Sequence, residues 1–153
     1  MELHRLAAPN LIFADVPGSD AATVLKALSG LIAAGGVVKD ADTLYRKLDE
    51  RERLGSTGIG NGVAVPHCKL KKLDRVVMAI GTSRSGVDFA AVDGEPVRLF
   101  FVVLSPEKDP AAHLQSLASI SKWVKANRHV ERILLCTDAD AILTLLGEGG
   151  GET

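Results

Sequence analysis

Hydrophobic positions in the first third of the chain recur at the three- and four-residue spacing of amphipathic helices. The first such pattern follows Asp20, a residue suited to cap a helix, and stops at the glycine pair that begins with Gly35. A second pattern begins near Asp40 and ends by Gly55. These two segments predict two consecutive helices joined by a short connection.

β-Branched and aromatic residues dominate the middle of the chain and predict strands. Residues 75–80 and 97–104 are two such segments, and residues 87–92 predict a third strand that turns at Asp93 and Gly94. Because residues 97–104 show little polar alternation, we expect them to form a central strand that is covered on both faces.

The last third of the chain predicts helices again. Asp109 can cap a helix that has Pro110 at its first position and runs to about Ala126. Two shorter helices are predicted over residues 130–135 and after Asp140. The whole pattern predicts an α/β fold, a mixed sheet with helices on both faces.

We therefore expect a single domain over residues 1–146 and a disordered glycine-rich tail over residues 147–153.

Composition narrows the classes of function. The 153 residues suit one domain, and 18 basic against 19 acidic residues remove the usual electrostatic case for nucleic-acid binding. No apolar run approaches the roughly 20 residues of a membrane span. The two cysteines, Cys68 and Cys136, lie far apart, so neither a disulfide framework nor a zinc cluster is indicated. We expect a cytoplasmic protein.

The candidate chemistry lies between residues 55 and 67. In this glycine-rich segment, Ser56, Thr57 and Gly58 can offer backbone N–H groups and hydroxyls to an anion, although no Walker or Gly-x-Gly-x-x-Gly motif is present. His67 follows a proline, and a neutral imidazole is a competent nucleophile near pH 7. Together they suggest phosphoryl transfer through a phosphohistidine. The alternative is an irregular turn beside an ordinary surface histidine.

Residues 51–67, RERLGSTGIGNGVAVPH, carry a family resemblance. They resemble the active-site signature of type-2 enzyme IIA domains of the bacterial phosphoenolpyruvate-dependent phosphotransferase system, the fructose–mannitol type. The wording LGSTGIGNG is most similar to the nitrogen-regulatory branch. The resemblance extends over about residues 11–146 and implies the type-2 enzyme IIA sandwich fold.

The resemblance also implies roles for particular residues. His67 would accept the phosphoryl group, His113 would be the second active-site histidine, and Arg51 would lie near the phosphate. The position of His113 in the first turn after Asp109 agrees, since a helix N-terminus favours negative charge. Arg53 competes with Arg51 for the role of the arginine.

Two further sets of residues stand apart from this pattern. His4 and His129 match nothing in the signature, and we expect both on the surface. Cys68 stands where the family usually has glycine; if that position needed a positive φ, a cysteine there would cost about 1 kcal/mol of strain.

Three functions remain open at this point. The resemblance implies that a histidine-containing phosphocarrier protein is the donor, with no metal or other cofactor. The favoured function is a regulator whose phosphorylation state controls binding to a target protein. The first alternative is a sugar-transport enzyme IIA that passes the group to a permease IIB domain. The second, motivated by Cys68, is a binding module that has lost transfer.

Overall fold

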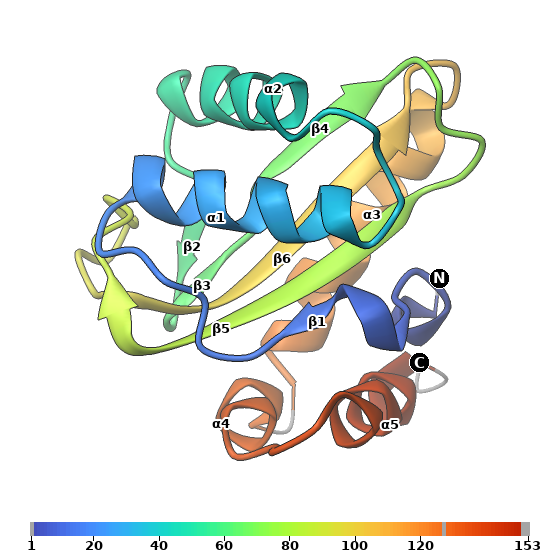
Figure 1. The fold of residues 1–153 in the computed structure, drawn as a ribbon. Coiled ribbons are helices and arrows are strands. Elements are labelled where there is room, and N and C mark those ends of the chain that lie inside the picture. Colours follow the sequence, from blue (N-terminus) through green and yellow to red (C-terminus); the bar gives the residue numbers. More distant parts are fainter. Residues whose placement is uncertain (1, 127, 151–153) are drawn as a thin grey trace.

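Within residues 2–126 and 128–150, which the computed structural model describes, six strands form one mixed sheet and helices cover both of its faces (Figure 1). The strands are β1 (Ile12–Phe13), β2 (Gly58–Gly60), β3 (Val63–Ala64), β4 (His67–Leu70), β5 (Val77–Val87) and β6 (Val97–Pro106). The helices are α1 (Ala21–Ala34), α2 (Ala41–Arg53), α3 (Pro110–Val124), α4 (His129–Leu134) and α5 (Ala139–Gly150). The predicted α/β architecture is confirmed.

Strand β6 lies at the centre of the sheet, as its unbroken apolar run predicts. It pairs with β5 in antiparallel fashion and with both β3 and β4 in parallel, in the order β1-β5-β6-β3-β2 with β4 also on β6. Strands β3 and β4 follow each other along one side of β6, and the register places His67 opposite Val103. This pairing fixes the backbone of His67 against the most buried strand.

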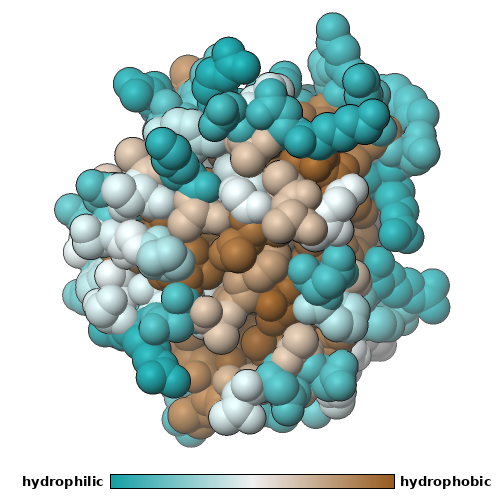
Figure 2. All heavy atoms as spheres, in the orientation of Figure 1, coloured by the Kyte–Doolittle hydropathy of each residue, from teal (hydrophilic) through white to brown (hydrophobic). Residues whose placement is uncertain are grey.

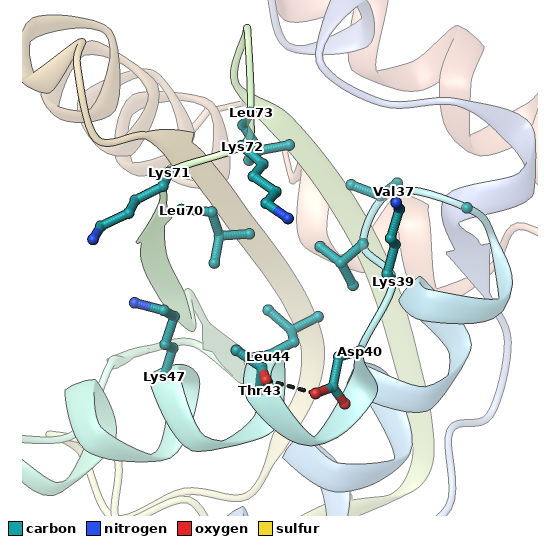
Figure 3. A pocket seen from close by; sticks show the side chains of 12 residues that line it. Val37, Lys39, Asp40, Thr43, Leu44, Lys47, Leu70, Lys71, Lys72 and Leu73 are labelled. Atoms are coloured by element: carbon teal, nitrogen blue, oxygen red, sulfur yellow. Dashed lines mark hydrogen bonds between the residues drawn. The ribbon is translucent and has the colours of Figure 1, made fainter.

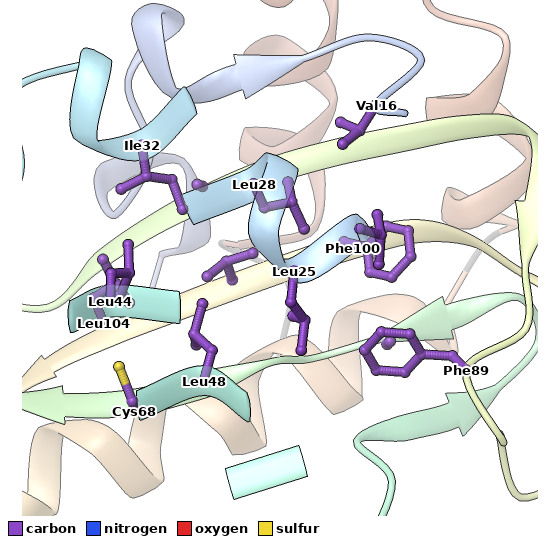
Figure 4. Packing of buried hydrophobic residues seen from close by; sticks show 14 of the residues in the cluster. Val16, Leu25, Leu28, Ile32, Leu44, Leu48, Cys68, Phe89, Phe100 and Leu104 are labelled. Atoms are coloured by element: carbon purple, nitrogen blue, oxygen red, sulfur yellow. The ribbon is translucent and has the colours of Figure 1, made fainter. Parts of the chain in front are cut away.

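The two faces of the sheet bury separate hydrophobic clusters, because successive residues of a strand point to opposite faces. Phe100 faces α1 and α2, where Leu25 and Leu48 pack in the same cluster (Figure 4). Phe101 faces the other way and shares a cluster with Trp123 of α3 and residues of α4 and α5. Burial of each such side chain stabilises the fold by roughly 1.5–3 kcal/mol.

The predicted helix starts are confirmed by their caps. The Asp20 side chain accepts the N–H of Thr23 at 2.9 Å, and the Asp109 side chain accepts the N–H of Ala112 at 3.1 Å. Asp40 caps α2 in the same way. These contacts satisfy N–H groups that a helix leaves without partners in its first turn.

The predicted strand over residues 87–92 is wrong. Only Val87 belongs to a strand, Asp88 forms a single bridge with Asp20, and Ala90 has φ of 50°. The apolar residue that suggested a strand, Phe89, is instead buried against Phe100, with ring centroids 5.4 Å apart. Burial of this one ring takes precedence over regular strand pairing.

The turn expected after this segment does form. The N–H of Gly94 donates to the carbonyl of Ala91 at 3.0 Å, and Gly94 has φ of 72°.

The surface position expected for His129 is also wrong. His129 is 2% exposed, and its ring stacks on Trp123 with centroids 4.2 Å apart. Its Nδ1 lies 2.8 Å from the carbonyl oxygen of Trp123, so the ring closes the junction between α3 and α4. His4 is partly exposed.

The C-terminal helix is longer than expected. Helix α5 continues through Gly150, so residues 147–150 are helical rather than part of a disordered tail, and Glu148 pairs with Arg132 of α4 at 2.8 Å. Residues 151–153 lie outside the described residues. In the part of the chain that the structure describes, no helix has the length and apolar character needed to cross a membrane.

Candidate functional site

The hydrogen bonds of His67 define its protonation. Its Nδ1 lies 2.7 Å from the carbonyl oxygen of Val65, which can only accept a hydrogen bond. Its Nε2 lies 3.1 Å from the Nε–H of Arg51, which can only donate. Both contacts are satisfied by one tautomer, with the proton on Nδ1 and a lone pair on Nε2.

The surroundings of His67 keep this neutral form dominant. Burial lowers the pKa of His67 below its usual value, and the positive charges of Arg51 and Lys69 lower it further. The hydrogen bond to the Val65 carbonyl opposes these effects. A neutral ring with a lone pair on Nε2 is the nucleophilic form of histidine.

Helix α2 brings Arg51 to His67. Leu44 and Leu48 face the core, and Arg51, three residues after Leu48, lies on the same side of the helix. Its Nη1–H also donates to the carbonyl of Gly55 at 2.9 Å, which holds the guanidinium beside the ring.

The competing arginine, Arg53, also lies near the site but makes a different contact. Its side chain is 76% exposed and pairs with Asp49 at 2.7 Å. The structure therefore brings Arg51, and not Arg53, into hydrogen-bond contact with His67.

Helix α3 lies on the other face of the sheet from α2, and it brings His113 to His67. The two ring centroids are 5.3 Å apart, and His113 is 6% exposed. The Nδ1 of His113 lies 2.6 Å from the hydroxyl oxygen of Ser105, which is fully buried on β6. Burial lowers the pKa of His113, and the neighbouring His67 and Lys69 lower it further.

The two histidines border an open cavity of about 690 Å³. Its lining carries four basic side chains, of which Arg53 is already paired with Asp49, and one carboxylate; the lining residues are Lys47, Glu50, Arg51, Arg53, Leu54, His67, Cys68, Lys69 and His113. This excess of positive charge favours an anionic group beside Nε2 of His67.

A family model described as "Phosphoenolpyruvate-dependent sugar phosphotransferase system, EIIA 2" matches residues 5–149. The chain belongs to this family. The resemblance found in residues 51–67 is thereby confirmed, and membership supports a phosphocarrier role for this EIIA chain.

Individual relatives agree in sequence and in fold. A nitrogen regulatory protein of Pseudomonas aeruginosa is 34% identical over 146 residues, which cover 95% of each chain. A fructose-specific EIIA component of Haloferax volcanii is 30% identical over 147 residues, 96% of each chain. The crystal structure of nitrogen regulatory protein IIA-Ntr from Neisseria meningitidis superimposes with a TM-score of 0.86 at 26% identity, covering 94% of this EIIA chain and 98% of that one.

Polar groups of the glycine-rich loop form hydrogen bonds with other residues of the EIIA chain. The N–H and hydroxyl of Thr57 both donate to the Glu52 carboxylate at 2.7 Å. The hydroxyl of Ser56 donates to the Phe89 carbonyl at 2.6 Å and accepts the N–H of Gly58 at 3.0 Å. These donors do not line the cavity beside His67, so the structure gives no support to the expected phosphate-binding role of Ser56, Thr57 and Gly58.

Cys68 fits its position without backbone strain. It lies within the regular strand β4 and is not among the residues with a positive φ, so the strain considered from the sequence does not arise. Its side chain belongs to the cluster beneath α1 and α2, and burial raises the pKa of the thiol to about 12. The thiol therefore stays neutral.

Two residues that position the site were missed in the sequence. Glu52 anchors the loop through Thr57, and Ser105 holds the ring of His113. A signal for Ser105 exists: alternation from Phe101 through Val103 puts Ser105 on the face that α3 covers. Glu52 gives no comparable signal, because it lies among several charged residues.

Proposed function

We propose that this EIIA chain is a phosphocarrier in which Nε2 of His67 accepts a phosphoryl group from the phosphohistidine of a histidine-containing phosphocarrier protein. The observation that carries the proposal is the pair of contacts on His67. Val65 fixes the proton on Nδ1, and Arg51 marks the lone pair on Nε2 within a cationic, open cavity.

The transfer step exchanges one N–P bond for another. The lone pair on Nε2 of His67 attacks phosphorus, the new N–P bond forms, and the donor N–P bond breaks with its electron pair remaining on the donor nitrogen. The ring of His67 gains positive charge as the bond forms, and its Nδ1–H bond to the Val65 carbonyl stabilises that charge. The step needs no metal or nucleotide.

Arg51 and His113 act on the oxygens of the phosphoryl group. The hydrogen bond from Arg51 to Nε2 must first break, and the guanidinium then offsets the negative charge of the incoming phosphoryl oxygens. His113, with its Nδ1 held by Ser105, presents the rest of its ring to the same cavity. Positioning and charge stabilisation of this kind account for most of the catalysis of phosphoryl transfer.

The proposed biological role is regulation rather than sugar transport. The loop wording LGSTGIGNG and the identity to the Pseudomonas aeruginosa nitrogen regulatory protein both support a regulator whose phosphorylation state controls a target protein. The identity to the fructose-specific EIIA component of Haloferax volcanii keeps transport as the second candidate.

Phosphoryl transfer is tested by incubation with phosphoenolpyruvate, enzyme I and a phosphocarrier protein. We expect one phosphoryl group that is labile in acid and stable in alkali, and that is absent from His67→Ala. His113→Ala should label slowly, with peptide mapping still placing the group on His67. An acid-stable label, or normal labelling of His67→Ala, would overturn the assignment; absence of any label from the wild type would favour the non-transferring binding module.

A second experiment distinguishes the regulatory role from the sugar-transport role. The labelled EIIA chain is combined with a purified fructose permease IIB domain, and the label on each protein is followed over time. A regulator should keep its label, whereas rapid passage to the IIB domain would establish the transport alternative.

A further inference from the structure

A second cavity, of about 720 Å³, lies beside the N-terminal half of α2, whereas Arg51 lies near the C-terminal end of that helix. It is bordered by the α1–α2 connection, the first turns of α2 and the β4–β5 connection, and it is open to solvent on one side (Figure 3). Figure 2 shows hydrophobic surface beside long hydrophilic side chains at the upper right of the view, where Figure 1 places these three segments. The volume falls within the roughly 300–1,000 Å³ range of small-molecule sites.

The cavity combines an apolar floor with a cationic rim. The apolar side chains come from all three segments: Val37, Val38, Leu44, Leu70 and Leu73. Four lysines surround them: Lys39, Lys47, Lys71 and Lys72. In Figure 3, Lys47 and Lys71 lie together at one side and Lys39 lies at the other, with Leu44 and Leu70 between them.

The charges of the rim are not neutralised by the protein. Among the described residues, no ion pair or side-chain hydrogen bond engages the ammonium group of any of these four lysines. The one acidic residue in the lining, Asp40, is already used as the cap of α2. Its carboxylate accepts the N–H of Asp42 at 3.0 Å and the hydroxyl of Thr43 at 2.7 Å. The cavity therefore has three more positive than negative charges.

We propose that this cavity binds a small organic anion, a molecule with an apolar body and a carboxylate, sulfonate or phosphate group. The apolar body would displace water from the floor formed by Leu44 and Leu70, and the anionic group would lie among the rim lysines. Because the walls come from three chain segments around one hollow, the cavity favours a compact ligand over an extended peptide. The site shares only Lys47 with the cavity beside His67, so it does not depend on the phosphocarrier function.

The test uses two fluorescent probes that differ in charge. 8-Anilinonaphthalene-1-sulfonate carries the anionic group, whereas N-phenyl-1-naphthylamine has a similar aromatic body without it. Titration of the unphosphorylated protein should show saturable binding of the sulfonate and binding of the uncharged probe that is weaker by about tenfold or more.

Variants assign that binding to the rim. The double variant Lys71→Ala/Lys72→Ala should weaken sulfonate binding by about tenfold and leave the uncharged probe nearly unchanged. The matched control is Lys26→Ala/Lys122→Ala, which removes two exposed lysines outside the cavity and should bind like the wild type. Circular dichroism and the Tm verify folding, and Lys39→Ala replaces the double variant if that one unfolds.

Backbone amide NMR locates the probe. Shifts of residues 36–40 and 70–73 upon sulfonate addition would support the site. Equal affinity for the two probes, equal loss in the control variant, or shifts confined to another surface would each overturn the proposal. Because no phosphoryl donor is present, failure here is distinct from failure of phosphorylation at His67.

Discussion

Replacement of Arg51 by alanine tests whether the guanidinium stabilises the transferred group. In the resting protein, Arg51 donates from Nε to Nε2 of His67 at 3.1 Å and from Nη1 to the Gly55 carbonyl at 2.9 Å. The variant removes an oriented, charged donor from the position where we propose that the phosphoryl oxygens bind. Loss of one such donor typically costs about 10²–10³-fold in rate, or about 2.7–4 kcal/mol of transition-state stabilisation.

The same substitution has a second, opposite effect on His67. Removal of the positive charge raises the pKa of His67, because Arg51 helps to lower it in the wild type. It also frees Nε2 from its hydrogen bond, which by itself favours attack. These gains are smaller than the loss, since the ring is already neutral near pH 7 and a part-buried hydrogen bond to a charged group contributes about 1.5–3 kcal/mol.

The assay is single-turnover transfer from a phosphorylated phosphocarrier protein, followed by quenched flow. Arg51→Ala should be slowed about 10²-fold yet still accumulate one phosphoryl group on His67 at long times. Arg53→Ala is the matched control, because its exposed pair with Asp49 contributes little, and its rate should stay within about twofold of wild type. A normal rate for Arg51→Ala combined with a slow Arg53→Ala would refute the assignment.

Three other predictions concern the histidines and the thiols. The folded pKa of His67 lies below 6.5, so its contribution to folding is fully present above pH 6.5 and is lost as the pH falls through the folded pKa. An NMR titration should therefore show the ring of His67 still mostly neutral at pH 6.5. Ser105→Ala should destabilise the fold by about 1–3 kcal/mol in denaturant melts and slow transfer, because Nδ1 of His113 loses its buried partner. Iodoacetamide at pH 8 should modify Cys136 before Cys68, whose pKa is about 12, and equal modification would contradict the buried position.

Local signals in the sequence predicted most of the fold. The caps at Asp20, Asp40 and Asp109 act within three residues along the chain, and the apolar run of β6 directly records burial on both faces. The strand prediction over residues 87–92 failed because a buried aromatic residue in an irregular segment gives the same local signal as one in a strand; here that residue is Phe89. The surface position predicted for His129 was wrong for a related reason, because its partner, Trp123, belongs to the preceding helix.

The contact of Arg51, rather than Arg53, with His67 could have been predicted from the sequence. Leu44, Leu48 and Arg51 recur at helical spacing, so the same periodicity that predicted the helix also directs Arg51 toward the sheet. Arg53 is four residues after Asp49, a spacing that predicts the exposed ion pair that the structure contains.

The tautomer of His67 depends on contacts that no local pattern contains. Val65 is two residues away, but its carbonyl reaches Nδ1 only because Pro66 and the pairing of β4 with β6 set the course of the backbone. Arg51 is 16 residues away and comes from the helix layer on one face of the sheet, whereas His113 comes from the layer on the other. The lone pair on Nε2 is therefore a property of the assembled layers, and changes that shift α2 against β4 should alter reactivity even when all three side chains remain.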